Sequence, residues 1–184
     1  MENETKTEVK KKDDGGILKT VIITAAVCLI ANIFGGLANV NGESMTNTLQ
    51  PSDKLLYQKV GFTPAHGDII IAKTPKSKNI LIKRVIGVPG DVIDINFLEH
   101  KIYRNGEPLD EPYIKEQDVD YYKLSQESEY VTFPITVGDN EVFAMGDNRN
   151  NSFDCRNIGC LSYQEIQGKV LCRLLPISSF GNIS

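Results

Sequence analysis

Residues 21–40 form an apolar run without a single charged side chain, and this run limits what the chain can fold into. Twenty such residues are enough to cross a bilayer as a helix, so we predict a transmembrane helix over residues 17–40. Lysines gather before the run, and the positive-inside rule therefore places residues 1–16, a polar and disordered tail, in the cytoplasm. Residues 41–184 then form an extracytoplasmic domain.

Two other interpretations of this run stay open. A cleaved signal peptide also places basic residues before an apolar run, and Gly36-Leu37-Ala38 has the small-x-small pattern of a cleavage site. A buried helix of a soluble protein is the third interpretation. The length of the run favours the membrane span over both.

The part of the chain after residue 40 consists of short apolar segments separated by turn residues. Strands are expected at 53–60, 69–72, 80–86, 92–97, 101–109, 131–137, 141–145 and 169–175. Asn105-Gly106 predicts a hairpin, residues 161–166 one helical turn, and the polar residues 110–130 an excursion from the core. This pattern predicts a mostly β fold built on antiparallel sheet, closed or sandwiched.

Composition excludes several classes of function. The formal net charge of -4 gives no basic surface for nucleic acid. His66 and His100 lack the spacing of metal ligands, so no metal or other cofactor is expected. Cys155 and Cys160 are close enough for a small disulfide loop, but spacing does not decide between that pairing and a buried thiol at Cys155.

Lys83 lies inside the apolar strand that runs from Ile80 to Ile86. Burial among aliphatic side chains disfavours the charged form of an amine and lowers its pKa. A neutral lysine can act as a general base. The competing interpretation is a lysine that extends from an edge strand into water.

Ser44 lies in the loop directly after the apolar run, beside Gly42. A serine hydroxyl needs a base, and His66 belongs to a turn rather than to a recognisable catalytic triad. A desolvated lysine can replace imidazole in this role. Residues 146–156 form a third segment, a polar loop dense in hydrogen-bonding groups.

Four motifs in order behind the apolar run resemble those of the bacterial type I signal peptidases, which are membrane-anchored leader peptidases with a Ser/Lys dyad. The motifs are Ser44-Met45 with Thr48-Leu49, Gly67-Asp68, Lys83-Arg84 with Gly87-Val88-Pro89-Gly90-Asp91, and Gly146-Asp147-Asn148-Arg149 with Ser152, Asp154 and Arg156. The resemblance extends over most of the chain after residue 17. Because it has lysine rather than histidine at position 83, the chain resembles the bacterial branch of the family.

The resemblance implies a serine endopeptidase that removes N-terminal signal peptides from secreted preproteins after small-x-small sites. Ser44 would form the acyl-enzyme, its backbone N–H would stabilise the oxyanion, and Lys83 would be the general base. Ser152 would hydrogen-bond the lysine amine. Four charged residues would support the loop around Ser152, namely Asp147, Arg149, Asp154 and Arg156.

The resemblance also implies a mostly antiparallel β domain whose hydrophobic face rests on the membrane. The expected partners are secretory preproteins, the lipid bilayer and the secretion translocon. Two departures from the family pattern stand out. Gly42 occupies a position where many relatives have a serine that helps to bind the oxyanion, and Asn47 stands where relatives usually have proline.

Two competing functions follow from the same residues. Self-cleaving repressor proteases share a Ser/Lys dyad, but they carry a DNA-binding segment and no membrane helix. A membrane-tethered binding module without catalysis is the other, and the intact Ser44, Lys83 and Ser152 argue against it.

Overall fold

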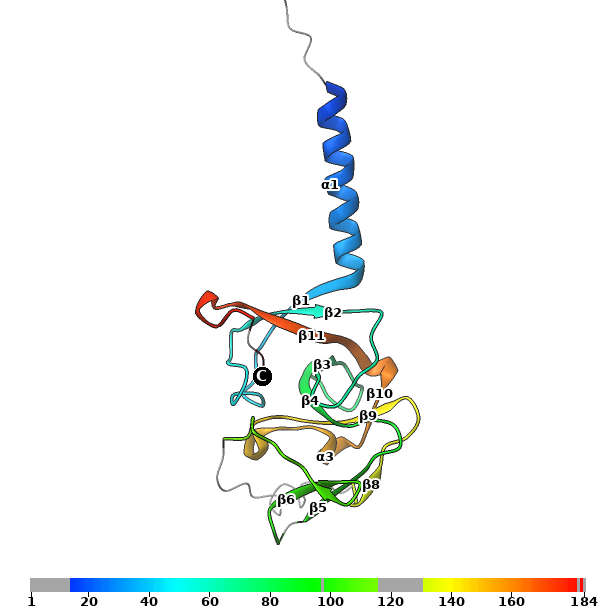
Figure 1. Ribbon diagram of the computed structural model, residues 1–184, viewed down its shortest axis with the longest axis vertical. Coiled ribbons are helices and arrows are strands. Elements are labelled where there is room, and N and C mark those ends of the chain that lie inside the picture. Colours follow the sequence, from blue (N-terminus) through cyan, green and yellow to red (C-terminus); the bar gives the residue numbers. More distant parts are fainter. Residues whose placement is uncertain (1–13, 97, 116–130, 182, 184) are drawn as a thin grey trace, which may run out of the picture. The chain divides into compact units, whose positions relative to one another are not determined.

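The computed structural model describes residues 14–96, 98–115, 131–181 and 183 (Figure 1). The chain divides into two compact units, Met1–Phe34 and Gly35–Ser184. Residues 1–13 of the predicted tail and residues 116–130 of the predicted excursion lie outside the described part of the chain.

The described residues of the first unit form the helix α1 (Asp14–Phe34). It begins inside the segment predicted as tail, so residues 14–16 are helical. Among the described residues, no helix has both the length and the apolar character that crossing a membrane requires.

The predicted helical boundary at residue 40 is wrong, because the chain becomes strand β1 (Gly35–Asn39) directly after Phe34. Two successive glycines lower helix propensity at this point. Gly36 also lets β1 pack closely on its neighbour, since a Cβ there would lie 2.4 Å from Cζ of Tyr57. Pairing with the next strand therefore prevails over continuation of the helix.

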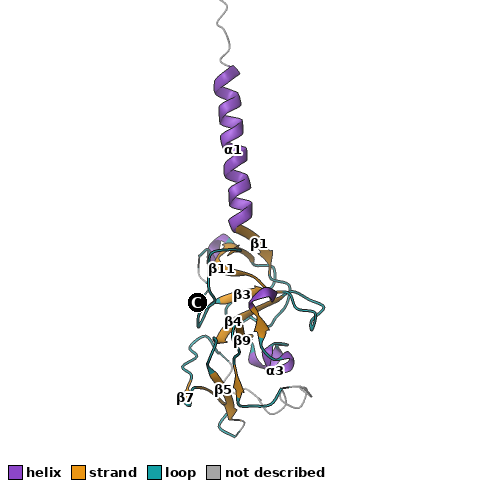
Figure 2. Cartoon of the chain, turned by 90° about the vertical axis from the view of Figure 1, so that its right-hand side faces the viewer, coloured by secondary structure: helices purple, strands orange, loops and turns teal. Residues whose placement is uncertain are grey.

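The second unit contains two antiparallel sheets, which confirms the mostly β prediction. The larger sheet has the order β1, β2 (Lys54–Gln58), β11 (Ile166–Leu175), β3 (Ile69–Ala72), β4 (Leu81–Gly87), β9 (Glu141–Met145) and β10 (Leu161–Ser162). The smaller sheet has the order β7 (Glu107–Pro108), β6 (Lys101–Arg104), β5 (Val92–Asn96) and β8 (Ile135–Thr136). Figures 1 and 2 both place β4 and β9 between β1 and β11 on one side and the smaller sheet on the other.

Short helices lie between the later strands and after the last one. They are η1 (Arg149–Asn151), α3 (Cys155–Ile158), η2 (Tyr163–Glu165) and η3 (Ile177–Ser179). The predicted helical turn at 161–166 is correct only for η2, because residues 161 and 162 pair with β9. The hairpin prediction is confirmed, and both residues of its turn, Asn105 and Gly106, have positive φ.

Two hydrophobic clusters position the strands that matter for the site. Leu81 and Val85 of β4 belong to the larger cluster. Ile69 and Ile71 of β3 belong to the other, which also contains Met45 and Leu49. The turn that carries Ser44 is thereby packed beside β3, the hydrogen-bonded neighbour of β4.

Candidate active site

Lys83 and Ser44 meet in the structure. The Nζ atom of Lys83 donates a hydrogen bond to Oγ of Ser44 over 2.5 Å. Lys83 is held by the antiparallel pairing of β4 with β3, where it lies opposite Ile70. Ser44 is held by burial of its neighbour Met45, which is 1% exposed. The two candidate residues named from the sequence are therefore in direct contact.

The Lys83 side chain lies in the protein interior and is 3% exposed. The interpretation of Lys83 as an edge residue extending into water is therefore wrong. Burial lowers the pKa of its amine, and the negative charge of Asp154 opposes this only in part. The environment thus favours the neutral amine, which is the form that can accept a proton from Ser44.

The loop after β9 fixes the backbone of Ser44. The amide of Asn148 donates to the Ser44 carbonyl over 3.0 Å, and the Asn148 side chain donates to Oγ1 of Thr46 over 2.9 Å. A Cβ on Gly146 would lie 2.4 Å from the Ser44 carbonyl oxygen and 2.2 Å from Oγ of Ser152. Glycine is required at residue 146 because the two loops approach each other so closely.

The Ser152 side chain lies close to Gly146, but its hydrogen-bond partner differs from the expected Lys83 amine. Its Oγ donates to Oδ2 of Asp154 over 2.6 Å. Its expected hydrogen bond to the Lys83 amine is not among the contacts of the described residues. Ser152 therefore connects the loop to Asp154, whose charge acts on Lys83 through space.

Asp154 and Arg156 form the expected ion pair, with Nη2 of Arg156 2.8 Å from Oδ2 of Asp154. Asp154 is also the N-cap of α3, where its side chain accepts from the Arg156 amide. Burial alone would raise the pKa of Asp154, but the Arg156 charge and hydrogen bonds outweigh it and hold the pKa to about 2. The carboxylate thus stays charged over the working pH range.

Asp147 forms an ion pair with Arg84, a partner that the sequence did not assign. Two parallel hydrogen bonds join them, Nε to Oδ1 over 2.9 Å and Nη2 to Oδ2 over 2.7 Å. Thr48, four residues after the nucleophile candidate, donates to the same carboxylate over 2.5 Å. Asp147 therefore links the strand of Lys83 to the turn of Ser44.

Arg149 is fully buried, and its partner Glu111 is a residue that the sequence analysis missed. Nη1 and Nη2 of Arg149 donate to the two Glu111 oxygens over 2.9 and 2.6 Å. Tyr113 donates to Glu111 over 2.9 Å, and its ring lies 4.2 Å from Cζ of Arg84. No signal in the sequence indicated this contact, because Glu111 lies in the polar segment that was interpreted as an excursion from the core.

The described cysteines of the β domain are not paired with one another. Cys155, Cys160 and Cys172 are free, so of the two interpretations of Cys155 the buried thiol is correct. Burial raises the pKa of the Cys155 thiol, which stays protonated. Among the described residues, no group of His, Cys, Asp and Glu side chains is arranged to hold a metal ion.

Comparisons with known proteins agree on one family. The profile of the family described as "Signal peptidase, peptidase S26" matches residues 16–175. "Probable signal peptidase I-1" of Synechocystis sp. is 36% identical over 155 residues, which cover 78% of this chain and 73% of that protein. "Signal peptidase I U" of Bacillus subtilis is 35% identical over 162 residues, 83% of this chain and 82% of that protein.

A solved structure of a signal peptidase I from Enterococcus faecalis is also similar to this chain. It aligns over 60% of this chain and 98% of that one, with a TM-score of 0.48 and 25% sequence identity.

Proposed function

The chain belongs to the peptidase S26 family of signal peptidases, and we propose that Ser44 and Lys83 carry out its cleavage of N-terminal signal peptides. It is a serine endopeptidase of that family, acting on secretory preproteins. The observation that carries the residue assignment is the 2.5 Å contact between a buried lysine amine and the hydroxyl of Ser44. No histidine is needed to activate the serine.

The geometry supports acyl transfer in two stages. Neutral Lys83 takes the proton from Oγ of Ser44 as the oxygen attacks the scissile carbonyl carbon, which forms a tetrahedral oxyanion. The ammonium of Lys83 then gives the proton to the departing amine, the C–N bond breaks, and the signal peptide remains as an ester on Ser44. A water, deprotonated by the same amine, hydrolyses the ester and regenerates the serine.

The oxyanion is assigned to the backbone N–H of Ser44. Gly42 supplies no hydroxyl, so this enzyme works without the side-chain donor that many relatives of its kind have. One such donor is worth roughly 10²-fold in rate in other enzymes. The buried ion pairs of Asp147 and Asp154 help to hold the turn of Ser44 and the side chain of Lys83 in position.

We also assign the apolar N-terminal segment the role of a membrane anchor, with its start in the cytoplasm and the β domain outside. The proposal rests on the uncharged, mostly apolar residues 20–34 of α1 and on the lysines that precede them in the sequence. This topology places Ser44 soon after the end of the anchor along the chain. Preproteins delivered by the secretion translocon are the substrates it would meet there.

Mass spectrometry of the products of one purified preprotein tests the activity. Cleavage at a single bond after a small-x-small sequence is expected, with no cleavage by the Ser44→Ala variant. A matched preprotein with phenylalanine in place of the small residue before the bond should stay intact, because only small side chains are accepted there. Cleavage at scattered bonds, or equal cleavage of the two preproteins, would overturn the assignment.

A further inference from the structure

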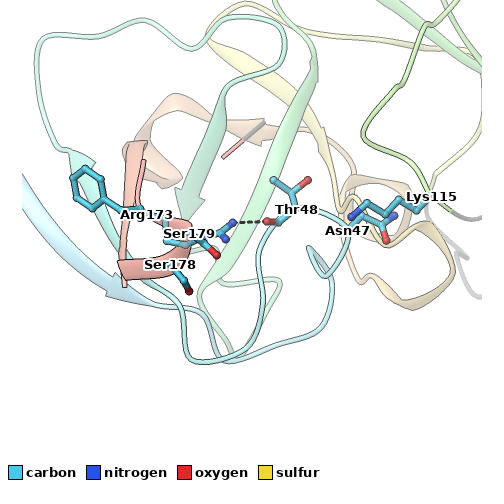
Figure 3. Close-up of a pocket in the computed structure, with 7 residues that line it drawn as sticks. Asn47, Thr48, Lys115, Arg173, Ser178 and Ser179 are labelled. Carbon is cyan, nitrogen blue, oxygen red and sulfur yellow. Dashed lines mark hydrogen bonds between the residues drawn. The ribbon is translucent and has the colours of Figure 1, made fainter. Parts of the chain in front are cut away.

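A polar pocket of about 350 Å³ lies next to the turn that carries Ser44 (Figure 3). Its lining residues come from three parts of the β domain. They are Asn47, Thr48, Lys115, Arg173, Ser178, Ser179 and Phe180. The proposed cleavage mechanism uses none of these side chains as a reacting group.

The pocket is suited to an anion. Its described lining residues include two cations and no acidic side chain. The charge of Arg173 is offset by Asp53, whose Oδ2 lies 2.9 Å from Arg173 Nε. Lys115 is exposed and supplies the remaining positive charge, while Ser178 and Ser179 contribute hydroxyl donors.

The pocket is continuous with the nucleophile turn. Asn47 and Thr48 follow Ser44 by three and four residues, and Nη2 of Arg173 donates to the Thr48 carbonyl over 2.5 Å. Figure 3 shows this contact in the wall of the pocket. An extended peptide advances by about 3.3 Å per residue, so side chains a few residues from a bond held at Ser44 are within reach.

We propose that this pocket binds an acidic side chain of the preprotein close to the scissile bond. The inference rests on the proposed function and adds a specificity determinant to it. A carboxylate there accepts hydrogen bonds from the Lys115 ammonium and the serine hydroxyls, and charge-assisted bonds of this kind are the stronger ones. The pocket thus selects among preproteins by charge, separately from the selection for small residues.

Peptide substrates in detergent solution test the proposal. Each peptide carries glutamate at one position within four residues of the scissile bond, and its matched partner carries glutamine there. We expect kcat/KM to favour glutamate by about tenfold at one position, since a charged hydrogen bond is worth about 1.4 kcal/mol or more. The preference should shrink as NaCl is raised, because Lys115 is exposed.

The Lys115→Gln variant should lower this preference to about threefold or less, while cleavage of the glutamine peptide stays unchanged. Ser178→Ala gives a second, milder loss, and Lys101→Gln, an exposed lysine on the smaller sheet, keeps the full preference. An equal preference in Lys115→Gln and wild type, or no preference at any position, overturns the proposal. Absence of Ser44-dependent cleavage of every peptide instead overturns the proposed function.

Vesicle binding distinguishes the two possible ligands of the pocket, an acidic side chain of the preprotein and a lipid phosphate. Binding to phosphatidylglycerol vesicles is compared with binding to phosphatidylcholine vesicles for wild type and Lys115→Gln. If the variant loses phosphatidylglycerol binding but keeps the glutamate preference, the pocket takes a lipid phosphate and the proposal is wrong. Loss of the glutamate preference with unchanged vesicle binding supports it.

Discussion

Arg84 and Asp147 form a buried ion pair that joins the strand of Lys83 to the loop after β9. Nη2 of Arg84 lies 2.7 Å from Oδ2 of Asp147, and both side chains are nearly inaccessible to water. Thr48 donates to the same carboxylate, so the pair also holds the turn of Ser44. This carboxylate therefore helps to hold the serine in position relative to the lysine.

Asp147→Asn is expected to lower both stability and activity. It leaves the Arg84 guanidinium buried without its counter-charge, which typically costs about 3–5 kcal/mol. Urea unfolding followed by circular dichroism measures the free energy, with exposed Asp139→Asn as the matched control. Equal unfolding midpoints for the two variants would show that the ion pair does not hold the fold.

Gly146→Ala is expected to reduce cleavage strongly, because the new methyl group would collide with the Ser44 carbonyl and the Ser152 hydroxyl. The loops must then separate, which moves the nucleophile away from Lys83. Gly42→Ala is the matched control, since a Cβ there meets nothing within 4 Å. If both variants cleave a preprotein at the wild-type rate, the close approach of the loops is not needed for activity.

Glu111→Gln is expected to destabilise the domain, because it removes the charge that compensates fully buried Arg149. The free energy of unfolding should again fall by a few kcal/mol. Tyr113→Phe serves as the comparison, because it loses only the hydroxyl that donates to Glu111 and keeps the ring over Arg84. A smaller effect of Glu111→Gln than of Tyr113→Phe on the thermal midpoint would contradict this reading.

Much of the fold was predictable from the sequence, because β3 and β9 are short, apolar and bounded by turn residues. Residues 69–72 and 141–145 form strands with the predicted bounds. The strand at Gly35–Asn39 was not predictable. Its local sequence continues an apolar run, and its state is set by pairing with β2, a contact that the pattern does not contain.

The residues of the candidate site also include some that the sequence predicted and others that it did not. Ser44 and Lys83 could be named because few residue types can perform the chemistry and because their motifs resemble a family. Glu111 and Tyr113 could not, since a glutamate in a polar segment resembles any surface acid until a buried arginine faces it. Ser152 was expected to hydrogen-bond the Lys83 amine, and the sequence could not show that its hydroxyl donates to Asp154 instead.

The pH dependence of kcat/KM follows from the buried amine. Only neutral Lys83 can accept the serine proton, so activity should rise with pH through the pKa of Lys83. Burial lowers that pKa below its ordinary value of 10.5, and activity should therefore extend to lower pH than an exposed lysine would permit. Initial rates from pH 5 to 11 measure the midpoint. A rise centred near 10.5, or a flat profile, would contradict the assignment.

The most direct test of the account compares the initial rate of cleavage of one preprotein by wild type, Ser44→Ala and Lys83→Met, with exposed Lys101→Met as the control. Lys83→Met should also raise the free energy of unfolding by roughly 0.5–2 kcal/mol, because it removes a buried polar amine that stability does not need. The account predicts that both active-site variants stay folded and lose activity by a factor of ~10⁴ or more. Cleavage at the wild-type rate by either folded variant would contradict the assignment of Ser44 and Lys83.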